Sequence, residues 1–257
     1  MKALSIAASG MLAQQQRTEV VANNLANMTT TGYQRRRTEF NDLLYRHMPR
    51  RPKAGSSPGE VVPSGVHAGL GVQVGAVYRI HEQGSLKQTS NTFDLAIQGD
   101  GYFQIQLPNG DLAFTRDGTF QLNEAGQLVT HDGFPVQPGI NVTPNATDVT
   151  VNASGEILVT GADGATANVG SLQLAMFPNP GGLSAVGDNL FVATESSGAA
   201  GAATPGINGA GTVLQGFVES SNVNAIEEVS ALVRASRAYE MNSKVMAAAD
   251  QMMATRR

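Results

Sequence analysis

The chain has no cysteine and no tryptophan, and aromatic residues make up only 5% of its 257 residues. Without cysteine there can be no disulfide framework, thiolate metal site or cysteine nucleophile. No run approaches the roughly 18 apolar residues that a membrane-spanning helix needs. The formal net charge of -4 gives no general argument for binding nucleic acid. The composition thus argues against a disulfide-stabilised fold, a cysteine-dependent enzyme and a protein with membrane-spanning helices.

Residues with catalytic or metal-binding chemistry are few and scattered. The four histidines do not cluster at the spacing of metal ligands, and no serine lies in a nucleophile motif. His131 and Asp132 precede a glycine in a turn signal, where Asp-Gly is common for backbone reasons alone. We therefore expect no enzyme, no cofactor, no metal site and no small-molecule substrate.

Glycine is abundant instead, with 29 residues, and the middle of the chain alternates with period two. Phe103, Ile105 and Leu107 alternate with glutamines, and the run PNGD at 108–111 predicts the turn that follows. Short apolar segments separated by further glycine turns continue to about residue 176. This pattern predicts an antiparallel sandwich or barrel.

Both ends of the chain carry helical periodicity. A heptad stripe begins at Leu4, and a second face carries Ile6, Ala13 and Val20, so the N-terminal helix should have two neighbours. Near the other end, four residues recur at seven-residue intervals, with Ala235 and Ala249 between them: Leu232, Tyr239, Met246 and Met253. Val245 widens this second stripe. Matched heptads at both ends predict that the two helices pair and that copies of the chain supply the remaining burial.

The expected fold is α+β, with the terminal helices paired as a coiled-coil-like layer, an inserted antiparallel β-rich domain and a long extended connector. The expected segments are an N-terminal helix (1–32), a connector with an insertion (33–75), a β-rich domain (76–210), a return segment (211–223) and a C-terminal helix (224–257).

The run ANNLANMTTTGYQRRR at 22–37 ends the first helix. Asn23, Asn24 and Asn27 lie on a different face from the apolar stripe, so their amides are predicted to fix the register between subunits. Gly32 is the expected left-handed residue of the turn that follows. The residues predicted to form a self-assembly interface are Leu4, Ile6, Met11, Val20, Val21, Asn23, Asn24, Leu25, Asn27, Met28, Leu232, Tyr239, Val245, Met246 and Met253.

A basic, proline-rich stretch follows this turn. Seven of the 17 basic residues lie between Arg35 and Lys53. Few aromatic residues are near enough to stack on bases, so a solvated or interface-facing patch is favoured over a nucleic-acid site.

Several motifs resemble those of the bacterial flagellar rod and hook protein family. They are SGMLAQQQRTEVVANNLANMTTTGYQRRR near the start, FDLAIQGDGYFQI and FTRDGTFQLNEAGQLVTHDGFPVQ in the middle, and VESSNVNAIEEVSALVRASRAYEMNSKVMAAADQM near the end. The length, the TRDGTF motif and the insertion from about Tyr45 to Val72 are most similar to the distal rod branch of the family. The resemblance covers nearly the whole chain.

The resemblance implies a non-enzymatic subunit that assembles into a hollow rigid rod crossing the periplasm, after export without signal cleavage. It implies as partners further copies of the chain, other axial proteins of the rod and hook, the surrounding ring proteins and the export apparatus. The insertion would stiffen the rod, through residues that include Arg46, Arg50, Arg51 and Lys53.

Two alternatives stay open on the sequence. One is a related proximal rod or hook-type subunit, from which the long insertion distinguishes this chain. The other is a secreted β-rich binding protein or adhesin with a helical stalk, which would form a monomer or a closed oligomer rather than tubes.

Overall fold

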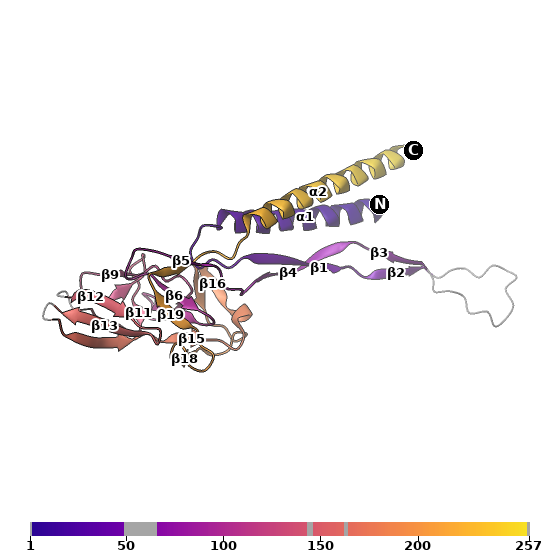
Figure 1. Ribbon diagram of the computed structural model, residues 1–257. Helices are drawn as coiled ribbons and strands as arrows, with labels where there is room; N and C mark the ends of the chain where they lie inside the picture. Colours follow the sequence, from indigo (N-terminus) through magenta and orange to yellow (C-terminus); the bar gives the residue numbers. More distant parts are fainter. Residues whose placement is uncertain (1, 49–65, 143–145, 162–163, 256–257) are drawn as a thin grey trace. The chain divides into compact units, whose positions relative to one another are not determined.

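The computed structural model describes residues 2–48, 66–142, 146–161 and 164–255 (Figure 1). The chain divides into two compact units. Unit 1 comprises Met1–Leu25, Arg36–Tyr78 and Ala225–Arg257, and unit 2 comprises Ala26–Arg35 and Arg79–Asn224. The architecture is α+β, as expected: a helix near each end of the chain and a β-rich middle.

Unit 1 contains two helices and a β ribbon. Its elements are α1 (Lys2–Ala26), α2 (Ala225–Ala254), β1 (Arg36–Asp42), β2 (Tyr45–Met48), β3 (Val66–Gly69) and β4 (Val72–Arg79). Strand β1 pairs with β4, and β2 pairs antiparallel with β3. The segment expected to be simply extended is therefore a two-stranded ribbon, in which each strand satisfies the backbone hydrogen bonds of the other.

Unit 2 is built from short strands that pair antiparallel. They are β5 (Leu86–Gln88), β6 (Leu95–Gln98), β7 (Tyr102–Gln106), β8 (Leu112–Thr115), β9 (Gln121–Leu122), β10 (Leu128–Val129), β11 (Val136–Gln137), β12 (Ala146–Val151), β13 (Glu156–Gly161), β14 (Thr166–Ser171), β15 (Leu174–Met176), β16 (Ser184–Gly187), β17 (Leu190–Val192), β18 (Gly201–Ala203), β19 (Thr212–Gln215) and β20 (Phe217–Glu219). The largest sheet runs β16-β17-β8-β7-β15-β18, with β11 also on β7. Strands β12-β13-β14 form a second sheet, and β19–β6, β20–β5 and β10–β9 are separate pairs.

The core of unit 2 confirms the alternation that the sequence shows. On β7, Phe103 and Ile105 are 0% exposed, while Gln104 and Gln106 are half-buried. Phe103 meets Phe120 edge to face, with ring centroids 5.1 Å apart. The predicted turn at 108–111 is present, because Gly110 N donates to Leu107 O at 2.9 Å.

The first helix ends earlier than its sequence pattern indicates. Helix α1 stops at Ala26, so Met28 lies in the turn that follows rather than on a helical stripe. Gly32 has a φ of +67°, which confirms its predicted left-handed conformation, although it stands six residues beyond the helix end. Among the described residues, no helix is long and apolar enough to cross a membrane.

Candidate assembly surface

Helix α1 has two neighbours inside unit 1. Val72 N, at the start of β4, donates to Ser9 Oγ at 3.3 Å, which ties α1 to the ribbon. On α2, the side-chain amide of Asn242 lies so close to Gly10 that a Cβ there would stand 2.8 Å from its Nδ2. The two helices run antiparallel, with the N-terminal end of α1 beside the C-terminal end of α2 (Figure 1).

These neighbours cover the two faces of α1 that the sequence pattern singled out. On the first stripe, Ala7 and Val21 are buried, and the following members are half-buried: Leu4, Met11, Gln14, Thr18 and Leu25. On the second stripe, Ala13 and Val20 are buried, whereas Ile6 is 40% exposed. Much of the apolar surface of α1 is thus used within the chain.

The covered face of α2 includes two members of the predicted stripe, Ala235 and Ala249. The covered positions recur at seven-residue intervals as Glu228, Ala235, Asn242 and Ala249. Tyr239 and Met253, expected on the seam, are 44% and 37% exposed, while Leu232 and Met246 are half-buried. The physical reason is that small residues such as Gly10 and Ala235 let the helix backbones approach closely, so larger side chains stand beside the contact.

Large apolar side chains on both helices remain exposed within the chain. Leu12 on α1 is 67% exposed. On α2, Ile226, Met241, Val245 and Met252 are 79%, 61%, 53% and 67% exposed. Several large exposed apolar side chains on two helices of one unit make these helices the candidate protein–protein interface.

The asparagines at the end of α1 have separate roles. Asn24 is 1% exposed, and its amide donates to Arg36 O at 2.8 Å and accepts from Arg36 N at 2.9 Å. The expectation that Asn24 contacts a neighbouring subunit is therefore wrong, because both of its polar atoms serve the start of β1. Asn23 is exposed, and Asn27 accepts a hydrogen bond from Thr30 Oγ1 at 3.2 Å.

The threonine and glycine run that follows is fixed inside unit 2. Gly32 N donates to Glu219 O at 2.8 Å, and Asn189 Nδ2 donates to Thr31 O at 2.8 Å. A Cβ on Gly32 would stand 2.8 Å from the backbone nitrogen of Asp117. Glycine is needed here both for its positive φ and for this close approach.

A buried ion pair lies beside that contact. Arg116 Nε and Glu219 Oε2 are 3.1 Å apart, with side chains 6% and 4% exposed. Arg116 also donates to the carbonyl oxygens of Gly99 and Gly101 at 2.7 and 2.8 Å. Burial raises the pKa of Glu219, while Arg116 and the backbone N–H of Gly84 lower it.

A second asparagine joins three segments of unit 2. Asn222 Oδ1 accepts from Arg35 N at 2.7 Å, and its Nδ2 donates to Ile80 O and Glu82 O at 3.0 and 2.9 Å. Neither the role of Asn222 nor the Arg116–Glu219 pair is predicted from the sequence. The available signals were the TRDG and ESSN motifs, which carry charged or amide residues between apolar strands.

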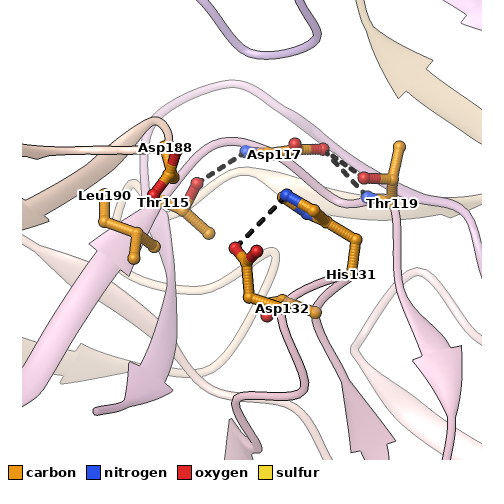
Figure 2. A pocket seen from close by; sticks show the side chains of 8 residues that line it. Thr115, Asp117, Thr119, His131, Asp132, Asp188 and Leu190 are labelled. Carbon is orange, nitrogen blue, oxygen red and sulfur yellow. Dashed lines mark hydrogen bonds and ion pairs between the residues drawn. The ribbon is translucent and has the colours of Figure 1, made fainter.

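The cavity beside His131 is small. His131 Nε2 lies 3.2 Å from Asp132 Oδ2, beside a cavity of about 10 Å³ that can hold one water molecule (Figure 2). Nearby, Asp117 is engaged with Thr115 and Thr119 rather than turned toward the histidine. In the part of the chain that the structure describes, no group of three or more histidine or acidic residues could hold a metal ion.

The predicted basic insertion falls mainly outside the described residues. Arg50, Arg51 and Lys53 belong to the undescribed segment, and for Arg46 only the backbone of β2 is described. Their expected role stays a prediction.

Three parts of the chain resemble known protein families. Three family profiles match: "Flagella basal body rod protein" over residues 4–34, "Flagellar hook protein FlgE/F/G D1 domain" over 96–159 and "Flagellar basal body rod FlgEFG protein C-terminal" over 214–255.

Several relatives similar over almost the whole chain are named flagellar basal-body rod protein FlgG. The one from Caulobacter vibrioides is 54% identical over 98% of this chain and 97% of its own length. That from Agrobacterium fabrum is 46% identical over 98% and 97%, and that from Bacillus subtilis is 34% identical over 95% and 94%.

Proposed function

The chain belongs to the FlgG family of flagellar basal-body rod proteins, and we propose that its copies join through unit 1. It is a structural subunit of the flagellar basal body, and FlgG, the name of the relatives that are 54% and 44% identical to it, is that of the distal rod protein. In our proposal the assembled copies form a hollow, rigid drive shaft. The shaft carries torque from the motor to the hook and encloses the export channel.

The observation that carries this proposal is the exposed apolar surface of the two helices. Ile226, Leu12 and Met252 are 79%, 67% and 67% exposed in the single chain. A helix stabilised mainly by tertiary packing gains little from such side chains until a neighbour covers them. Copies of the chain in a tube would supply that cover.

The proposed inner tube consists of residues 1–32 and 224–257. Residues 33–75 form the connector with its stiffening insertion, 76–210 form the outer domain, and 211–223 lead back to the C-terminal helix. Within the inner tube, the fifteen residues predicted from the sequence are proposed as the interface, less Asn24, whose amide is used inside the chain, and less Val20 and Val21, which are buried within it.

Assembly with other flagellar components follows from the family. Proposed partners are the proximal rod and hook proteins at the two ends of the shaft, the ring proteins around it and the export apparatus that delivers the chain. The proposed location is the part of the rod that crosses the periplasm, reached without cleavage of a signal peptide. The function needs no catalysis.

Removing residues 2–20 from the purified protein tests the role of α1. We expect loss of polymer formation, followed by light scattering and electron microscopy, because the deletion removes most of the covered stripes. Tubes formed as readily as by the full-length protein would contradict the proposal, and closed particles would favour the adhesin alternative.

The insertion has a separate test. Without residues 46–65, polymers should bend more, because the segment proposed to stiffen the shaft is missing. Straight polymers with the persistence length of the full-length protein would show that stiffness originates elsewhere.

A further inference from the structure

Unit 1 has a groove between helix α1 and strand β4. It encloses about 310 Å³, and its apolar side is formed by Leu12, Ala13, Val72 and Val74. Its polar side is formed by Ser9, Gln15, Gln16, Glu19 and Gln73. Leu12 is 67% and Val74 37% exposed, so the groove presents accessible apolar surface. We call it the α1–β4 groove.

Helix α2 carries a ridge of matching length. Met241, Val245, Ala248 and Met252 stand at positions i, i+4, i+7 and i+11, which places them on one face of the helix. This α2 ridge lies roughly a quarter turn away from the seam of Ala235, Asn242 and Ala249 that faces α1. At 1.5 Å per residue the ridge is about 16 Å long, close to the roughly 15 Å between Ser9 and Glu19.

We propose that the α1–β4 groove of one copy receives the α2 ridge of the next copy. The inference rests on the proposed function, because it assumes that unit 1 joins copies of the chain. Within one chain α2 contacts α1 through its seam, which leaves the ridge exposed. The ridge is therefore available to a second molecule, and its length and charge match the groove.

The direction of seating follows from charge and spacing. With the ridge antiparallel to α1, Met252 lies against Leu12, and Lys244 lies against Glu19. The helical rise gives about 10 Å from Leu12 to Glu19 and about 12 Å from Met252 to Lys244, so both contacts form together. Gln15 Nε2 donates to Glu19 Oε1 at 3.1 Å, which holds the carboxylate along the groove.

The use of two different surfaces also fits an open assembly. A groove that binds a ridge elsewhere on the same protein makes a heterologous contact, which repeats from copy to copy as a ring or a helix. A symmetric contact of groove with groove would stop at a dimer. The α1–β4 groove and the α2 ridge thus provide the repeat that a rod needs.

The absence of cysteine allows a direct crosslinking experiment. The variants Leu12→Cys and Met252→Cys are produced singly and mixed, and the double variant is produced in one chain. All are expressed in flagellated cells that lack the wild-type chain, and swimming reports whether they assemble. Purified basal bodies are then oxidised. We expect crosslinked dimers in the mixture and a ladder of multimers from the double variant, because the paired Cα atoms come within disulfide range of about 7 Å.

Ile226→Cys supplies the matched control. It lies on the same helix and is 79% exposed, but it is far from the ridge. Paired with Leu12→Cys, it should give no ladder. A ladder from the 12–226 pair, or dimers from Leu12→Cys alone, would overturn the inference. Motile cells whose basal bodies give no 12–252 crosslink would also overturn it, while the proposed function would stand.

A charge exchange covers the case in which a cysteine variant blocks assembly. Glu19→Lys and Lys244→Glu should each reduce swimming, since each places like charges together, and the double variant should recover most of it. Equal loss in the double variant would contradict the antiparallel seating. If the wild-type chain itself also failed to polymerise, like every variant, this result would count against the proposed function itself.

Discussion

The two units use apolar residues in opposite ways. In unit 2, Phe103, Ile105 and Leu174 are 0% exposed and lie in one continuous core. In unit 1, the fully covered residue of α2 is Ala235, while Ile226 and Met252 on the same helix are 79% and 67% exposed. The β-rich unit completes its core within one chain, whereas the helical unit leaves large side chains for a neighbour.

This difference separates stability from assembly. Substitutions in unit 2 should change the free energy of unfolding of a single chain, because its contacts are internal. Substitutions on the exposed faces of unit 1 should change the association of copies and leave the single chain nearly unaffected.

The largest expected effect is on the buried ion pair of unit 2. Arg116→Ala leaves the carboxylate of Glu219 without its partner, and Gly99 O and Gly101 O lose their donor. We expect a loss of about 3–5 kcal/mol in the free energy of unfolding, measured by denaturant titration of the monomer.

The double variant Arg116→Met with Glu219→Gln is the control for this effect. Because it removes both charges and keeps similar volume, it should be clearly more stable than Arg116→Ala. Equal destabilisation by the two variants would mean that the stability lost in Arg116→Ala does not come from an unpaired buried charge.

Gly32 tests the close backbone contact in the segment that leads out of α1. Gly32→Ala should destabilise unit 2 by about 3 kcal/mol, because its φ is +67° and a Cβ would press on the Asp117 backbone. Gly110→Ala is the matched control, with a φ of +90° and nothing within 4 Å of its Cβ. It should lose only about 1 kcal/mol. If both variants lost the same free energy of unfolding, the contact with the Asp117 backbone would add nothing to the cost of the positive φ.

The same substitution in the two units gives the most direct contrast. Val213→Ala, at a side chain 1% exposed in unit 2, should lower the free energy of unfolding by about 2 kcal/mol. Val245→Ala, at a side chain 53% exposed on α2, should change it by less than about 0.5 kcal/mol but raise the concentration needed for polymerisation. The reverse pattern would contradict the separation of roles.

The smallest expected effect is a pH dependence from His81 in unit 2. Burial, with Arg79 and Arg116 nearby, lowers the pKa of His81 below its usual 6.5. The folded state therefore takes up a proton less readily than the unfolded state, and the stability that His81 contributes is present above pH 6.5 and falls as the pH drops below it.

The test compares the wild type with His81→Gln between pH 7.5 and pH 5.5. The variant should lose less stability on acidification than the wild type does. Thermal unfolding of the monomer, followed by circular dichroism at each pH, measures the difference. If the stability of the wild type and of His81→Gln fell by the same amount on acidification, protonation of His81 would not be what links stability to pH.

Sequence periodicity predicted the elements in which the large apolar side chains are the buried ones. The alternation on β7 and the heptads near both ends gave the α+β architecture and the two neighbours of α1. On α2 the predicted stripe held Ala235 and Ala249, which are covered, together with Tyr239 and Met253, which are 44% and 37% exposed, because a heptad pattern does not tell which members of a stripe lie closest to the partner helix. Contacts between residues far apart in the sequence, such as Asn222 with Arg35, produce no periodic pattern in the sequence and so could not be predicted from it.

Hydrogen exchange measured on the monomer and on the assembled rod tests whether unit 1 needs neighbouring copies to complete its fold. We expect amides of α1 and α2 to exchange at least about 100-fold more slowly in the rod, while those of the unit 2 core strands β7 and β13 change little. Helices already as protected in the monomer as in the rod would contradict it, because unit 1 would then need no neighbour to complete its fold.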